Sequence, residues 1–294
     1  MTKILITGAS GHLGGLVIKH LIETEMLKPG DLVAGSRDPV KLAALAAKGI
    51  ETRKVDFNDP DSLAASFAGI DRLLIVSTDE LGAPGKRLAQ HQAAVAGAAK
   101  AGVGRLFYTS MPSPDDSRVT FAGDHLGTEQ AIKASGLAYT IFRNGWYMEN
   151  LFMALPSALA SGHWYTSAGT GVIAHIARDD MARAIAAGIA KPVADSVTYT
   201  LTGDTARTTE EIAALVAKAT GKPLTVVQLS DAQLAEGMAA AGLPAPFIPT
   251  IVSFDANTRD GKIAMVSRDF TTLTGRKQVS LEAFLATNAQ ALKG

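Results

Sequence analysis

Near its amino end the chain reads Ile4-Leu5-Ile6-Thr7-Gly8-Ala9-Ser10-Gly11-His12-Leu13-Gly14. The first three residues form a short apolar run, which is typical of a strand buried on both faces. Apolar residues then recur at helical spacing as far as Ile22. A strand, a glycine-rich turn and a helix thus follow one another directly, and this order predicts a phosphate-binding turn.

Each glycine of this turn has a physical reason to be there. One allows the tight turn, one lets the backbone approach a pyrophosphate, and one permits close packing of helix on strand. The N–H groups at the start of the helix would then bind the phosphates. We expect a dinucleotide to contact Gly8, Ala9, Ser10, Gly11, His12, Leu13 and Gly14, with only a minor contact from His12. A purely structural turn is the alternative.

Strand and helix patterns alternate six times before residue 145. Parallel neighbours need crossover helices, so the pattern predicts an α/β fold, a Rossmann-type doubly wound parallel sheet. Later residues are less regular, although Thr208-x-x-Glu211 predicts the start of a helix. We expect a nucleotide-binding domain over residues 1–150. Residues 151–294 would form a smaller substrate-binding portion packed on it.

The end of the second expected strand distinguishes the two nicotinamide cofactors. It reads Gly35-Ser36-Arg37-Asp38. A carboxylate here suits the ribose hydroxyls of NAD, whereas an arginine suits the 2′-phosphate of NADP. Arg37 favours NADPH over NADH, while Asp38 leaves the second reading open, because it could reach a ribose hydroxyl if the loop turned inward.

Composition excludes several classes of chemistry. The chain has 294 residues, 28 Lys plus Arg, 28 Asp plus Glu, and no cysteine. Zero net charge gives no reason to expect nucleic acid or an anionic membrane as partner. Disulfides, thiolate catalysis and cysteine-bound metals are excluded, and the histidines show no metal-ligand spacing. We expect a cytoplasmic protein without a metal; its oligomeric state stays open.

Three segments carry a resemblance to a known family. They are Ile6–Gly14, Asp124-His125-Leu126-Gly127-Thr128-Glu129 and Arg143-Asn144-Gly145-Trp146-Tyr147-Met148-Glu149-Asn150. With them the chain resembles the NmrA-like atypical short-chain dehydrogenase/reductases, and among these the bacterial NADPH-dependent quinone oxidoreductases and the triphenylmethane reductases. The spacing agrees over nearly the whole chain, more weakly after about residue 205.

The resemblance implies a set of cofactor contacts. Arg37 would bind the 2′-phosphate, Asp56 and Phe57 would flank the adenine, and Ser77 and Thr78 would lie beside the ribose. The residues that would pass the nicotinamide are Asn144, Gly145, Trp146, Tyr147, Met148 and Glu149. Arg178 would lie near the cofactor or at the domain contact.

The usual acid catalyst of the superfamily is missing. Classical members use a Tyr-x-x-x-Lys pair, and no tyrosine here has lysine four residues later. A ketone needs such a proton donor, whereas a quinone yields a phenolate that water can protonate. His125 and Tyr147 remain as candidates for proton relay or substrate orientation; a packed or capping role for His125 is the alternative.

Apolar residues near these segments suit a small planar aromatic substrate. We expect the substrate to contact Met111, Phe121, Trp146, Tyr147, Met148 and Phe152, although Met148 and Phe152 could equally be core residues. The leading function is therefore hydride transfer from NADPH to a quinone or similar acceptor. Two alternatives stay open: a dinucleotide-binding redox sensor without turnover, and a reductase or isomerase of a specific aromatic catabolite.

Overall fold

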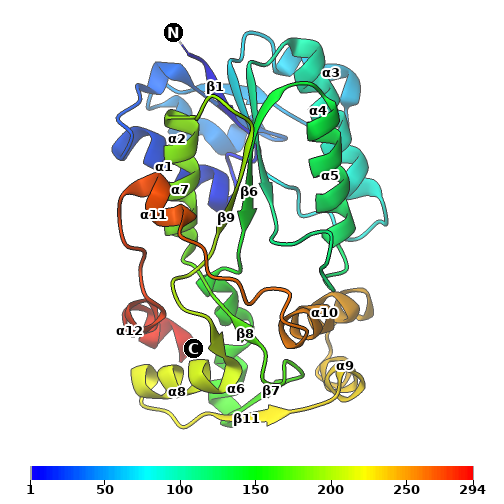
Figure 1. Ribbon diagram of the computed structural model, residues 1–294, viewed down its shortest axis with the longest axis vertical. Helices are drawn as coiled ribbons and strands as arrows, with labels where there is room; N and C mark the ends of the chain where they lie inside the picture. Colours follow the sequence, from blue (N-terminus) through cyan, green and yellow to red (C-terminus); the bar gives the residue numbers. More distant parts are fainter. Residues whose placement is uncertain (1, 294) are drawn as a thin grey trace.

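A seven-stranded parallel sheet forms the centre of the molecule, and the computed structural model describes residues 2–293 (Figure 1). The strand order is β3-β2-β1-β4-β5-β6-β9. The order reverses between β1 and β4, where ligands bind in doubly wound sheets. The strands are β1 (Ile4–Ile6), β2 (Leu32–Ser36), β3 (Glu51–Lys54), β4 (Arg72–Ile75), β5 (Arg105–Ser110), β6 (Ala138–Asn144) and β9 (Val197–Leu201).

Helices cover both faces of the sheet. One layer contains α1 (His12–Glu23), α7 (Arg178–Ala190) and α11 (Asp269–Thr274); the other contains α3 (Pro60–Ser66), α4 (Lys86–Ala101) and α5 (Ala122–Ala134) (Figure 1). Shorter elements flank β2, namely η1 (Pro29–Asp31), η2 (Pro39–Leu42) and α2 (Ala43–Ala46). Alternate strand residues face opposite layers, so Ile4 and Ile6 pack with α1 and α7 while Leu5 packs with α3 and α4.

A smaller layer lies beyond the carboxyl ends of the strands (Figure 1). Its elements are η3 (Met148–Met153), α6 (Leu155–Ser161), β7 (His163–Thr166), β8 (Val172–Ile173), β10 (Arg207–Thr208), α8 (Thr209–Thr220), β11 (Thr225–Gln228), α9 (Asp231–Ala240), η4 (Ala245–Phe247), α10 (Ile248–Arg259) and α12 (Leu281–Leu292). Leu155, Val216 and Leu285 belong to its separate apolar core. β11 pairs in parallel with β7, and β10 antiparallel with β8.

The predicted fold class, a doubly wound α/β sheet, is confirmed. The predicted helix start at Thr208 is also confirmed, because Thr208 and Glu211 form a reciprocal capping box at α8. Residues beyond 150 do more than cover the sheet, since β9 completes it and α7 packs on α1. How the chain divides into domains therefore stays a prediction.

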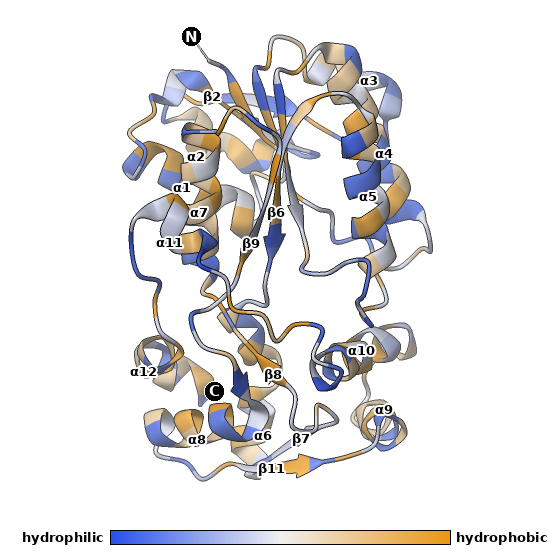
Figure 2. Cartoon of the chain, in the orientation of Figure 1, coloured by the Kyte–Doolittle hydropathy of each residue, from blue (hydrophilic) through white to orange (hydrophobic). Residues whose placement is uncertain are grey.

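The buried strands differ in hydropathy from the carboxyl edge of the sheet, where the site lies. β6 ends on Arg143 and Asn144, and the tip of its arrow is hydrophilic (Figure 2). That tip points toward the smaller layer. Polar side chains thus gather where the two layers meet. No helix within residues 2–293 is long and apolar enough to cross a membrane.

Candidate active site

A cavity of about 350 Å³ lies at the carboxyl ends of β1, β2 and β4, beside the start of α1. We call it the glycine-turn cavity. It is lined by Thr7, Gly8, Ser10, Gly11, His12, Leu13, Gly14, Ser36, Arg37, Val55, Phe57, Asn58, Val76, Ser77, Thr78, Asp79 and Gln90. The reversal of strand order therefore coincides with a hollow lined by the predicted turn.

The geometry of the turn requires glycine. Gly8 has φ +61°, a conformation that side chains disfavour. A Cβ on Gly14 would lie 2.8 Å from the carbonyl carbon of Gly8 and 3.1 Å from Cα of Ala9. The turn is anchored to β2 because the Ala9 N–H donates to the carbonyl of Gly35 at 3.0 Å. The start of α1 therefore lies in close contact with the turn. The first N–H groups of α1 point toward the glycine-turn cavity.

Arg37 and Asp38 have different surroundings at the end of β2. Arg37 is exposed and lines the glycine-turn cavity, with its charge available to an anion. Asp38 does not line the cavity; its Oδ1 accepts from the N–H of Val40 at 3.1 Å and caps η2. The carboxylate that suits NAD therefore has another role, and the cavity presents the arginine that suits a 2′-phosphate.

The other predicted contacts of this region divide into two groups. Phe57, Ser77 and Thr78 line the glycine-turn cavity, whereas Ala9 and Asp56 do not. Asp56 Oδ1 accepts from the backbone and the side-chain amide of Asn58, and these bonds lower the pKa of its carboxyl. The contact of Asp56 with adenine therefore stays a prediction.

Three side chains of α4 hold Thr78 in place. Arg87 Nε donates to the Thr78 carbonyl at 2.8 Å, and the Thr78 hydroxyl donates to Gln90 Oε1 at 2.8 Å. The N–H of Thr78 donates to Nε2 of His91 at 3.0 Å. All three polar groups of Thr78 are thus bonded, which fixes the turn after β4 on one wall of the cavity. No sequence motif announces Gln90 as a lining residue, because its role depends on how α4 packs.

The candidate catalytic His125 lies inside a buried polar network behind that turn. Arg87 Nη2 donates to His125 Nε2 at 3.0 Å, so the neutral ring donates from Nδ1 to the Tyr108 hydroxyl at 2.8 Å. Burial, and then the charge of Arg87, lower the pKa of His125 well below its ordinary value. His125 lines neither cavity described in this section, and both of its nitrogens are engaged.

The segment after β6 is held by backbone bonds on two sides. Gly145 N–H donates to the Leu201 carbonyl at 2.7 Å, where a Cβ would lie 2.8 Å from the same oxygen. Tyr147 forms a bridge with Ile176, and the guanidinium of Arg178 lies 4.8 Å from its ring centroid. Burial raises the pKa of the Tyr147 hydroxyl. The structure therefore brings Tyr147 and Arg178 together.

One buried polar atom of this segment lacks a partner. Asn144 Oδ1, at the end of β6, accepts no hydrogen bond from residues 2–293 although its side chain is buried. Such atoms are costly without a partner, so they point to a ligand or water. The tight glycine turn fits a bound dinucleotide, whereas the Asn144 oxygen is sealed and Asn144 lines neither cavity.

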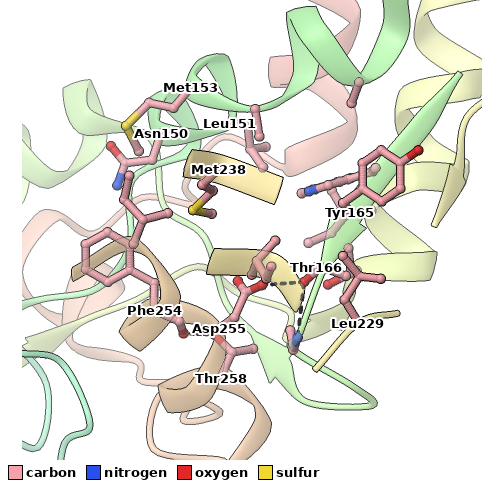
Figure 3. A pocket seen from close by; sticks show the side chains of 18 of the residues that line it. Asn150, Leu151, Met153, Tyr165, Thr166, Leu229, Met238, Phe254, Asp255 and Thr258 are labelled. Atoms are coloured by element: carbon pink, nitrogen blue, oxygen red, sulfur yellow. Dashed lines mark hydrogen bonds between the residues drawn. The ribbon is translucent and has the colours of Figure 1, made fainter. Parts of the chain in front are cut away.

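A second, larger cavity of about 730 Å³ lies in the smaller layer (Figure 3). We call it the C-terminal cavity; it is formed mainly by η3, α6, β7, α9 and α10. Its aromatic residues are Trp146, Trp164, Tyr165 and Phe254, and it includes one carboxyl group, that of Asp255. No lysine or arginine among the described residues lines it. The cavity is thus apolar and aromatic, with a single acidic side chain.

The predicted substrate residues occupy different places. Trp146 lines the C-terminal cavity, and its ring centroid lies 4.4 Å from that of Phe254. Phe121 packs edge-on against Phe254, in the same small cluster as Met111. Of the six predicted substrate residues, Trp146 alone lines a cavity, and the other five, Met111, Phe121, Tyr147, Met148 and Phe152, line neither. Tyr147 is stacked by Arg178, while Met148 and Phe152 pack in the core of the smaller layer. Asp255 and Tyr165 line a cavity that sequence reasoning did not predict from their positions.

No group of three or more His, Asp or Glu side chains within residues 2–293 could hold a metal ion. The candidate site comprises the glycine-turn cavity, the buried network that fixes its Thr78 wall, and the separate C-terminal cavity, which Trp146 and Phe254 line.

Comparison with known proteins agrees with this geometry. Residues 1–268 match the model of the NmrA-like family. The chain is 36% identical to quinone oxidoreductase 2 of Escherichia coli over 278 residues, which cover 95% of this chain and 96% of that protein.

Two solved structures are also similar to the chain. One is an Escherichia coli NADPH-dependent quinone oxidoreductase bound to NADPH, with TM-score 0.91, 35% identity and coverage of 99% and 100%. The other is triphenylmethane reductase of Citrobacter sp. bound to NADP(H), with TM-score 0.91, 30% identity and coverage of 98% and 100%. The sequence resemblance is thus confirmed, and the chain belongs to the NmrA-like family.

Proposed function

We propose that the protein transfers a hydride from NADPH to a quinone or a similarly electron-poor aromatic acceptor. The protein is an NAD(P)H-dependent oxidoreductase, as its family and its similarity to quinone and dye reductases show. The observation that carries the proposal is the glycine-turn cavity, which presents Arg37 to an anion while Asp38 caps a neighbouring turn.

The residues that would hold NADPH fit it at several points. The turn from Gly8 to Gly14 would hold the pyrophosphate, and Arg37 would pair with the 2′-phosphate. When bound, NADPH supplies the hydride. The protein's own part is to align the acceptor with the cofactor and keep water out.

The proposed acceptor class is supported by the missing Tyr-x-x-x-Lys pair. Within the described part of the chain, no tyrosine or lysine lines the glycine-turn cavity, and Tyr165 is the one tyrosine that lines the C-terminal cavity. Tyr108 is buried against His125, and burial raises the pKa of its hydroxyl. A quinone that gains a hydride becomes a hydroquinone anion, which takes its proton from water. Such an acceptor needs no acid at the site, whereas a simple ketone does.

Loss of NADPH absorbance with a panel of simple quinones tests the proposal. We expect turnover with quinones, no turnover with unactivated ketones, and a higher kcat/KM with NADPH than with NADH. Tight binding of both NADPH and NADP⁺ with no turnover of any acceptor would refute it and favour the redox-sensor alternative.

A further inference from the structure

The C-terminal cavity has the properties of a ligand site. Exposed large apolar side chains on a monomer are normally scattered, and their concentration marks a binding surface. Met153 is 70% exposed, Tyr165 53% and Leu243 37%, and all three line this cavity. Its volume, about 730 Å³, is within the range of small-molecule sites.

Asp255 is the one carboxyl group in this apolar wall (Figure 3). Its Oδ2 accepts from the hydroxyl of Thr166 and from the N–H of Ser167, both at 2.7 Å. Its Oδ1 accepts no hydrogen bond from residues 2–293, and this atom is not sealed from solvent. One oxygen is therefore fixed to β7 and the loop after it, and the other stays accessible from the cavity.

Among residues 2–293 no lysine or arginine forms an ion pair with this carboxyl group, although the nearby charge of Arg259 acts on it. Arg259, on the same helix, forms a two-point pair with Asp231 at 2.7 and 2.9 Å and donates to the Ser167 carbonyl. His175 lines the cavity, but burial lowers its pKa to about 4, so its ring is neutral near pH 7. Burial raises the pKa of Asp255, while its hydrogen bonds from Ser167 and Thr166 act in the opposite direction.

We propose that the C-terminal cavity binds the acceptor's apolar aromatic frame and that Asp255 selects frames carrying a cationic or N–H-bearing nitrogen. Aromatic faces attract such cations, and Trp146 and Phe254 line the cavity with their ring centroids 4.4 Å apart. An anionic ligand of the same shape would meet the Asp255 carboxylate without compensation. This inference rests on the proposed function for calling the ligand an acceptor.

Calorimetry without NADPH tests the site independently of turnover. The probes are methylene blue, a cationic tricyclic dye, and resorufin, an anionic tricyclic dye of similar size. Asp255→Asn keeps the side-chain shape and an oxygen that accepts from Thr166. We expect this variant to lose about tenfold or more in affinity for methylene blue, the cost of a charged partner. Resorufin should bind no more weakly to the variant than to the wild type.

The matched control is Asp260→Asn. This carboxylate follows α10, binds Arg118 Nε at 2.7 Å on the surface and does not line the cavity. Its variant should bind methylene blue like the wild type. Equal methylene blue affinity in Asp255→Asn and wild type would overturn the inference, and so would equal wild-type affinity for the two dyes, a comparison that needs no variant.

The two proposals fail separately. If the protein reduces quinones but binds the cationic and the anionic dye equally well, only the proposed role of Asp255 is refuted. Charge-selective dye binding with no consumption of NADPH would remove only the proposed reaction.

Discussion

Replacing Gly14 by alanine should damage NADPH binding through the backbone alone. The added Cβ would lie 2.8 Å from the Gly8 carbonyl carbon, and real Cβ atoms essentially never come within 3.0 Å. The obstacle is backbone of the turn itself, so either α1 or the turn must move. Overpacking of this kind costs about 1–3 kcal/mol. At about 1.4 kcal/mol for each factor of ten, we expect NADPH affinity to fall about tenfold or more.

Gly15→Ala is the matched control, one residue further along the same helix. Its nearest neighbour would be the Ala9 carbonyl oxygen at 3.5 Å, an ordinary contact. Alanine is also a better helix former than glycine by about 1 kcal/mol. This variant should therefore bind NADPH normally and unfold at equal or higher urea concentration.

Calorimetric titration with NADPH and urea denaturation of both variants provide the measurements. We expect the two variants to differ in NADPH affinity, although the two glycines are adjacent in the same helix. If Gly14→Ala binds NADPH as tightly as Gly15→Ala, the close approach of α1 to the turn does not matter for the cofactor and the argument fails.

Three further predictions concern other parts of the site. Arg37→Ala should weaken NADPH about tenfold or more and NADH about twofold at most, because only NADPH has the 2′-phosphate; equal losses by calorimetry would contradict the assignment. Tyr147→Phe should lower kcat with a quinone less than about threefold, since the reduced acceptor takes its proton from water, whereas a loss of 100-fold or more, the scale of general acid catalysis, would restore Tyr147 as proton donor. Burial lowers the pKa of His91 to about 3, so the folded state binds fewer protons than the unfolded one, and its contribution to stability, full above about pH 6.5, falls by at most about 1.4 kcal/mol per pH unit toward pH 3. Urea denaturation over this pH range should show a shallower fall in His91→Gln, and an unchanged slope would argue against a neutral buried His91.

Local patterns were enough to predict the parts of the fold that local chemistry controls. The glycine turn, the alternation of strands and helices and the cap at Thr208 each depend on residues a few positions apart. The helix α7 is harder to recognise because it is buried on several sides, where alanine and glycine surround Met181, Ile185 and Ile189. The place of β9 in the main sheet depends on pairing with β6, which begins 59 residues earlier, so no local pattern predicts it.

The candidate site divides in the same way. The turn and Arg37 are recognisable because their chemistry is written in adjacent residues. Thr78 was placed by resemblance, but the α4 side chains that hold it have no local signature. Asp255 is bonded to Thr166 from 89 residues away, so only the packed chain reveals it as a cavity residue.

The placement of tryptophan has a practical consequence. The chain has two tryptophans, Trp146 and Trp164, and both line the C-terminal cavity. Fluorescence excited selectively at tryptophan therefore originates entirely from the C-terminal cavity. The unlabelled protein thus contains a built-in optical reporter, whose intensity and colour should change when a molecule enters the cavity and should respond to the glycine turn only indirectly.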